Sequence, residues 1–309
     1  MFANFLTVTG QVATLFLMMG VGFVLGRLGK LTEAGRGQMS YLLLYIVTPC
    51  IIVDSFLVEA TPALMREVVV GESVFLSIYL FTFLLTLLFF RKQPPDARDS
   101  LRFGTILGNN GFMGLPLVEA VLGSGALIYG ALSMGAFNLI SWTIGVMLMG
   151  GRQNFSLRRA VVNPGVLGLS AGLVLFFTGL RFPSPIASAV SFLGDLNTPL
   201  AMVIIGAQLA EADLAACFRQ PRLYLASALR LVIVPLLAAL LILPLRLSPA
   251  LYCTVVLLSA VPAAGATGLF AQRFGRDPVP GVQFITLSTL LSIVTLPLFA
   301  VLAQALSGL

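Results

Sequence analysis

The stretch GNNGFMGLP, residues 108–116, decides the fold, because it interrupts an apolar segment with three glycines, two asparagines and a proline. A second interrupted segment, SAVPAAGATG, covers residues 259–268. Proline removes a backbone donor and glycine lowers helix stability, so a helix is expected to break in both places. Lipid cannot satisfy the freed N–H and C=O groups, which must therefore face protein or a water-filled cavity. We expect the breaks within about two to four residues of Pro116 and Pro262.

The composition is that of an integral membrane protein. Of the 309 residues, 58% are hydrophobic and 10% are charged, and the mean hydropathy is +1.02, whereas a soluble domain has about 25% charged residues. This excludes a soluble globular enzyme, a disordered protein and a nucleic-acid-binding protein, despite the net charge of +6. The chain has no histidine, and its three cysteines form no CxxC pair, so no metal, cofactor or disulfide framework is expected.

The apolar segments have the length that a membrane-spanning helix needs, about 20 residues. No charge precedes Arg27, whereas a secretory signal carries its positive charges ahead of the apolar core, so the first segment is interpreted as a retained helix. Basic residues alternate between the loops: 14 fall on one side, three on the other, and Arg230 is left inside the eighth span. By the positive-inside rule, both termini then lie outside the cytoplasm. We predict ten spans, at roughly residues 5–26, 38–57, 68–90, 100–121, 125–149, 164–180, 185–210, 223–245, 249–272 and 280–306.

The predicted spans fall into two sets of five, and an odd number per set means that a duplicated half inserts upside down. A shift of 150 positions aligns Thr48-Pro49 with Thr198-Pro199, and the two interrupted segments also correspond. The expected units are residues 1–150, a short cytoplasmic linker at 151–163, and an inverted second repeat at 164–309. Paired interruptions in inverted halves indicate a transport site, and the half-helix N-termini suit an anion. The alternative is ordinary proline kinks in packed helices.

Several motifs resemble the auxin efflux carrier family of membrane transporters, which includes bacterial malonate-type carriers. The resemblance covers nearly the whole chain, and its more specific motifs are residues 109–116 and STLLS at 288–292. The others are Thr48-Pro49, Asn163-Pro164, Thr198-Pro199, residues 206–209 and residues 260–271.

The resemblance implies an all-α membrane protein with two inverted five-helix repeats, whose broken helices four and nine cross at Pro116 and Pro262. It also implies an elevator mechanism, with helices 1, 2, 6 and 7 as scaffold and helices 3–5 and 8–10 as the moving part. A homodimer in a bacterial inner membrane is expected. The long central loop of the plant carriers is missing, so neither its regulation nor auxin itself is carried over.

Polar residues beside the interruptions are the candidate substrate site. By motif position, the resemblance places Asn109 on the substrate carboxylate. Asn109 and Asn110 also offer donors and acceptors to broken backbone, so structural capping is the alternative. The full candidate set is Asn109, Asn110, Gly114, Pro116, Pro262, Ala263, Gly265 and Asn138.

Charged residues inside the spans are costly and are therefore candidates for function. Asp195 and Arg230 are predicted at similar depths, where they can form a buried pair. The alternatives are a coupling or gating site on one hand, and a static ion pair or exposure in an aqueous vestibule on the other. Glu72, about one turn into the third span, is a second candidate for proton coupling.

The function expected from these features is secondary transport of a small organic anion, a carboxylate. The partners are this substrate, the lipid bilayer and a second copy of the chain, with no nucleic acid. No nucleotide motif is present, so ATP is not the expected driver. The main alternative is a cation-coupled carrier of the bile-acid-symporter or sodium–proton-antiporter type. Such carriers need carboxylates near the crossing, whereas the two interrupted segments contain none, and Glu119 lies three residues beyond Pro116. An intramembrane enzyme would need a nucleophile or a metal-binding constellation, and the sequence shows neither. A receptor-like module without transport would leave the paired interruptions unexplained.

Overall fold

The computed structural model describes residues 2–308, and the side chains of all of these except residues 2–9, 11, 159, 164 and 214. Within this range the chain is helical, and its one isolated β-bridge joins Gly108 to Ala263. The α-helices are α1 (Phe2–Arg27), α2 (Glu33–Leu42), α3 (Thr48–Ser55), α4 (Pro62–Thr86), α5 (Pro95–Ile106), α6 (Leu115–Leu122), α7 (Leu127–Ile140), α8 (Val146–Gly150), α9 (Leu157–Val161), α10 (Pro164–Thr178), α11 (Ser184–Asp195), α12 (Asn197–Glu211), α13 (Leu214–Phe218), α14 (Pro221–Ala228), α15 (Val234–Ile242), α16 (Pro249–Ala260), α17 (Ala266–Arg273) and α18 (Val279–Ser307).

Short π-helical turns join several of these helices into longer ones. They are η1 (Leu43–Val47), η2 (Asn110–Gly114), η4 (Ser141–Gly145) and η6 (Leu229–Ile233). Single 3₁₀ turns occur at η3 (Ser124–Ala126), η5 (Arg152–Asn154) and η7 (Leu243–Leu245). A π turn inserts one residue into a helix without ending it, so α2 and α3, α7 and α8, and α14 and α15 each form one continuous rod.

Among the described residues, six helical stretches are long and apolar enough to cross a membrane, as expected for an integral membrane protein. They are Glu33–Ser55, Pro62–Thr86, Ser124–Gly150, Ser184–Glu211, Pro221–Leu245 and Val279–Ser307. The first predicted span coincides with α1 (Phe2–Arg27), and the three others coincide with shorter apolar helical stretches, at Asn110–Leu122, Gly165–Thr178 and Pro249–Ala260. The count of ten spans stays a prediction.

Three of the described helices, α4, α10 and α16, start with a capping side chain followed directly by proline. Thr61 accepts a hydrogen bond from the Leu64 N–H (3.2 Å), and Ser248 accepts one from the Leu251 N–H (3.4 Å). In each case the next residue is proline, whose missing N–H is not needed at the first helical position. These capping residues define where the helices begin.

Glycines allow a close contact between α1 and α12. A Cβ on Gly22 would overlap the main chain of Val203, and a Cβ on Gly206 would overlap the main chain of Met19. The two backbones therefore touch directly, as small residues permit between membrane helices. Gly26 of α1 also lies against α12, so both Gly22 and Gly26 face this contact within the chain.

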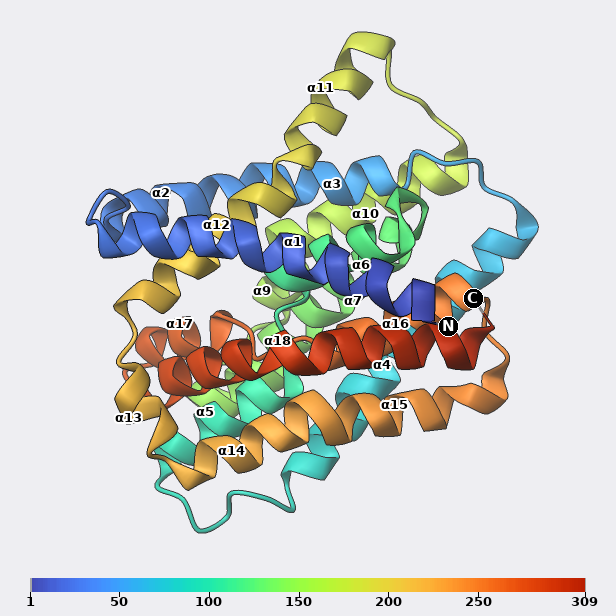
Figure 1. Ribbon diagram of the computed structural model, residues 1–309. Helices are drawn as coiled ribbons and strands as arrows, with labels where there is room; N and C mark the ends of the chain where they lie inside the picture. The colour runs from blue at the N-terminus through green and yellow to red at the C-terminus, as the bar shows by residue number, and fades with distance from the viewer. Residues whose placement is uncertain (1, 309) are drawn as a thin grey trace.

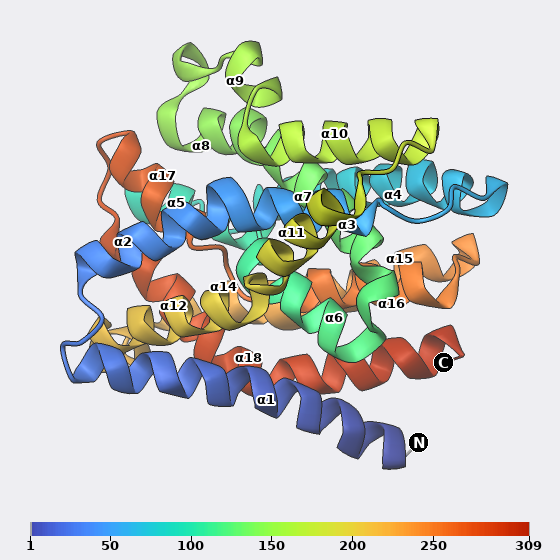
Figure 2. The ribbon, with the colours of Figure 1, turned by 90° about the horizontal axis from the view of Figure 1, so that it is seen from above.

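Figures 1 and 2 show the arrangement of these rods. The axes of α1, α15 and α18 are roughly aligned, and the two chain ends lie close together at one end of the molecule, so α1 and α18 run in opposite directions. Helix α11 projects from the rest in Figure 1 and packs against α3 near its base. Helix α3 also contacts α10, while α16 lies between α15 and α18.

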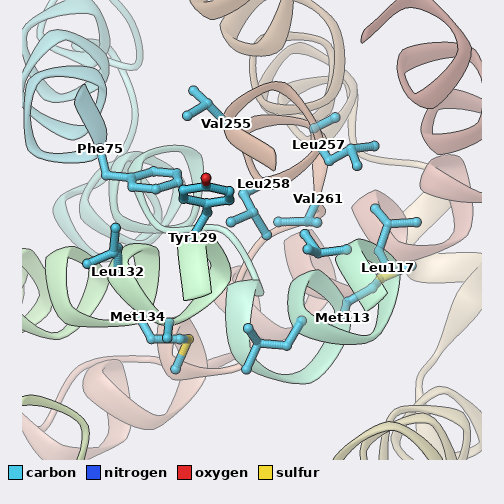
Figure 3. Close-up of a cluster of buried hydrophobic side chains, with 14 of the residues drawn as sticks. Phe75, Met113, Leu117, Tyr129, Leu132, Met134, Val255, Leu257, Leu258 and Val261 are labelled. Atoms are coloured by element: carbon cyan, nitrogen blue, oxygen red, sulfur yellow. The ribbon is translucent and has the colours of Figure 1, made fainter. Parts of the chain in front are cut away.

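The interior is an apolar cluster that surrounds the two interrupted segments. Figure 3 shows Leu258 and Val261, at the end of α16, among side chains from α4, α6 and α7 that include Phe75, Leu117 and Tyr129. Leu117 and Val261 are fully buried. The interruptions are therefore held inside packed protein rather than exposed to lipid.

Candidate functional site at the crossing of two broken helices

The two interrupted segments meet and pair with one another. Helix α5 ends at Ile106 and α16 ends at Ala260, and both chains continue in extended conformation. The Asn109 N–H donates to the Pro262 carbonyl (2.8 Å), and the Ala264 N–H donates to the Leu107 carbonyl (2.9 Å). Gly108 and Ala263 are the antiparallel pair at the centre. The freed backbone groups are thus partly satisfied by the other break.

The position of the first break differs from the prediction. Residues 107–109 are unwound, whereas the chain is helical from Asn110 through Pro116 to Leu122, so the break ends seven positions before the proline. Pro116 is the second residue of α6 and directly follows η2, so the helix continues through the proline. The π turn η2 absorbs the change in register, because the Leu115 N–H donates to Asn110. The crossing therefore does not lie at Pro116.

The second break lies where it was predicted. Pro262 belongs to the unwound residues and accepts the Asn109 hydrogen bond, and the Ala263 N–H donates to the Ser288 hydroxyl (3.2 Å). Gly265 precedes α17 as its N-cap residue. Gly114 lies in η2, where a Cβ would overlap Leu258, so α16 packs directly on this turn.

Arg230 of η6 reaches the crossing from the side. Its Nε donates to the Val261 carbonyl (2.8 Å), Nη2 to Leu258 (3.1 Å) and Nη1 to Thr105 (3.4 Å). Thr105 and Leu258 lie in the last turns of α5 and α16, where carbonyls lack helical partners and carry partial negative charge. The guanidinium thus caps both half-helices at once.

The sequence explains why these two carbonyls are free. In a continuous helix the Thr105 carbonyl accepts from residue 109 and the Leu258 carbonyl from residue 262. Here the Asn109 N–H donates across the crossing instead, and Pro262 has no N–H. Arg230 supplies the missing donors.

The charge of Arg230 has no acidic partner. The side chain is 3% exposed, and among the described residues none of the ion pairs within 4.0 Å involves it. The carbonyl ends of α5 and α16 compensate this buried cation, because each helix C-terminus carries about half a negative charge. Arg230 therefore disfavours a second cation at the same place.

The expected pair between Asp195 and Arg230 does not form. Asp195 is the exposed last residue of α11, whereas Arg230 is buried at the crossing. The prediction compared only depths in the membrane, which says nothing about lateral position. Residues at equal depth on different rods need not meet.

The two adjacent asparagines have different surroundings. Asn110 is 2% exposed, and its Nδ2 donates to the Tyr79 hydroxyl (2.9 Å) and to Ser133 (3.3 Å). It ties η2 to α4 and α7, although its Oδ1 is buried without a partner. Asn109 is half-buried, and within the described structure its amide makes no side-chain hydrogen bond. Asn109 is therefore the freer of the two amides.

The remaining candidates lie outside this group of contacts. The Asn138 Nδ2 donates to Met134 of its own helix (2.8 Å), and its amide lies against Gly165 of α10. Glu72 is half-buried on α4 and faces Gly135 of α7. Its Oε2 atom is buried and has no hydrogen-bond partner among the described residues.

A small cavity, close to the size of one water molecule, lies beside Arg230. Its polar lining comes from Tyr79, Asn110, Arg230, Thr82 and Ser259. It is too small for an organic acid in this conformation. The sequence analysis missed Tyr79, because a single tyrosine in an apolar helix carries no signal of its own.

Sequence reasoning did not predict the contacts of the Thr198-Pro199 motif or the burial of the residue before it. Thr198 of α12 donates to the Glu119 carboxylate of α6 (3.0 Å). Asn197 is fully buried with neither of its amide atoms hydrogen-bonded in the described structure.

An all-helical membrane protein whose two broken helices pair at a buried positive charge belongs to the broad class of membrane transport proteins. A family model described as membrane transport protein matches residues 7–156 and 152–300. The chain therefore belongs to this auxin efflux carrier-like family of membrane transporters. It is also similar to an uncharacterized transporter of Methanothermobacter thermautotrophicus, with 25% identity over 303 residues that cover 96% of this chain and 99% of the relative.

Proposed function

We propose that the protein is a secondary carrier for a small organic anion with one carboxylate, which binds at the crossing of the two broken helices. The observation that carries the proposal is the buried Arg230 charge at the crossing, which has no carboxylate partner among the described residues. The guanidinium is a full, fixed charge that a carboxylate can approach, and broken helices at membrane depth are typical of transport sites.

The free amide of Asn109 and apolar walls define the kind of substrate. Phe112, Met113 and Ala264 flank the unwound residues and offer no charge. A carboxylate held by amide and dipole contacts is bound without being trapped. A small apolar body with one charged end fits this lining best, and a malonate-type dianion is the comparison case.

An elevator mechanism with ten spans in two inverted repeats is part of the proposal. Its support is that α1 packs on α12, and α3 on α10 and α11, which are the expected scaffold helices. The expected moving helices likewise pack on one another, for example α4 on α7 and α16 on α18. A homodimer in a bacterial plasma membrane, with no cofactor and no enzymatic activity, completes the proposal.

The alternative of a cation-coupled carrier is less well supported. A coupling cation at the crossing requires acidic groups or free carbonyls. The two free helix-end carbonyls already accept from Arg230, whose charge repels a second cation.

A thermal-shift titration of the purified protein tests the proposal. Acetate and malonate are compared with acetamide and malonamide, which have the same shapes without the charge, each in sodium and in choline salts. The carboxylates are expected to raise the unfolding midpoint saturably in both salts, because a ligand at 100 times its Kd stabilises by about 2.7 kcal/mol. Uptake of the stabilising anion into proteoliposomes then tests transport. Stabilisation that follows sodium and ignores the carboxylate would overturn the proposal.

A further inference from the structure

The crossing places two helix C-termini close together inside the membrane. Each carries about half a negative charge from its unpaired carbonyls. In α5 and α16 these ends face each other at the Gly108–Ala263 bridge. Two such ends in a low-dielectric interior require a nearby positive charge.

Arg230 meets this requirement with a geometry that only a guanidinium provides. Its three nitrogens each donate to a different carbonyl, one on each half-helix and one on the unwound Val261. A lysine ammonium is a point charge and cannot span these positions in the same way. The residue therefore links α5, α16 and η6 through one planar group.

Gly108 is matched to this arginine. A Cβ on Gly108 would overlap the Arg230 guanidinium and approach Val261. Since Gly108 is not among the glycines with positive φ, its role here is to leave space for the arginine. The backbone at the centre of the crossing is thus shaped around the guanidinium.

We infer that Arg230 is a resident cation, covalently part of the chain, which occupies the site where the two helix ends would otherwise bind a free cation. Its removal leaves a cation site with three carbonyl ligands, which is specific for a planar guanidinium. This holds whatever the carrier transports. If the proposed anion transport is correct, the fixed charge also makes sodium unnecessary at the crossing.

Chemical rescue of Arg230→Ala tests the inference. The unfolding midpoint of the purified variant is expected to fall by about 5–10 °C. Millimolar methylguanidinium should restore most of this loss saturably, while choline at equal ionic strength should not. Arg66→Ala removes an exposed arginine of α4 and serves as the matched control, with no rescue expected. Rescue by choline, or none by either ion, would overturn the inference.

Arg230→Met supplies a second test, which also applies if Arg230→Ala does not fold. Methionine fills much of the space without the charge, so the variant should stay less stable than the wild type and should not respond to methylguanidinium. Arg230→Met as stable as the wild type contradicts the inference. Neither assay contains an organic acid, so their failure is distinct from failure of the proposed substrate.

Gly108→Ala gives a third, independent readout. The added Cβ should displace the guanidinium and lower the unfolding midpoint in the wild type, but much less in the Arg230→Met background. Additive losses would show that Gly108 and Arg230 are not coupled.

Discussion

At the scale of single residues, Asn109 and Asn110 differ in what their side chains touch, so their variants should fail differently. Asn109→Ala is expected to weaken binding of the transported anion by about tenfold or more, because a hydrogen bond to a charged group contributes about 1.5–3 kcal/mol. Its unfolding midpoint without ligand should stay close to that of the wild type. Ligand titration by thermal shift measures both quantities.

Asn110→Ala is expected to show the reverse. It removes the donor to Tyr79 and Ser133, so stability without ligand should fall, while the ligand affinity of the folded fraction changes less. Tyr79→Phe deletes one of these hydrogen bonds and is the matched control, with a smaller loss expected. Unchanged ligand affinity in Asn109→Ala, or a larger affinity loss in Asn110→Ala, would contradict this division.

Arg230 and Asp195 should behave as independent residues. They lie on different rods, one buried and one exposed. Arg230→Leu and Asp195→Leu are therefore expected to be additive in a double-mutant cycle of unfolding free energies, within about 0.3–0.5 kcal/mol. A coupling well above that range would mean that the two charges meet in another state of the carrier.

The sequence could reveal that Arg230 was unusual but not which groups it contacts. A charge inside an apolar segment is visible in one dimension, whereas its partners are main-chain carbonyls that every residue possesses. Only Pro262 carried a usable hint, because a proline always leaves the carbonyl four residues earlier without its helical donor. That carbonyl is Leu258, and Arg230 caps it.

At the scale of helices, the contact between α1 and α12 depends on the absence of side chains at two positions. Gly22→Leu and Gly206→Leu should each lower the unfolding midpoint strongly, because both helices would have to separate. Gly20→Leu is the control, since Gly20 is exposed with open space around it. Equal midpoints for Gly20→Leu and Gly22→Leu would rule out the close contact.

The sequence predicted that helices would break near 108–116 and 259–268, and the structure confirms both breaks. It did not predict the exact position of the first break, because the helix continues through Pro116. The unwound residues are 107–109, which include Gly108 and Asn109. Residue type predicts flexibility, but the pairing of Gly108 with Ala263 depends on the tertiary fold.

The short helix α13 connects α12 to α14, and Cys217 on it is 1% exposed. Burial, with a smaller contribution from Asp213, raises the pKa of the Cys217 thiol above its ordinary value. Maleimides react with the thiolate, so labelling at pH 7 should be slow and should increase as the pH rises toward that pKa. The measurement uses Cys50→Ser Cys253→Ser protein, with detergent-denatured protein as control. Equal labelling rates in the folded and denatured protein at pH 7 would contradict the buried position.

At the scale of the whole molecule, composition was sufficient to predict a helical membrane protein, because 10% charged residues cannot cover a soluble surface. The predicted spans also fall on observed helices. What the sequence could not give was which spans touch. Helix α1 contacts α12 although more than half of the chain separates them in sequence, and nothing in their separate apolar patterns distinguishes that partner from others.

The orientation in the membrane follows from charge and from the position of the chain ends. Both ends lie at the same end of the molecule (Figure 2), which is required if the chain crosses the membrane an even number of times. Fourteen basic residues fall in one set of loops and three in the other, so the richer set, including the loop around Arg152, is expected in the cytoplasm. Alkaline phosphatase fused after Leu309 should then be active in a bacterial host, whereas phosphatase fused after Asn154 should be inactive. Green fluorescent protein at the same two sites should give the opposite pattern. If both phosphatase fusions behaved alike, an even number of spans would separate residue 154 from residue 309. The five-plus-five division would then be wrong, together with the inverted repeat that depends on it.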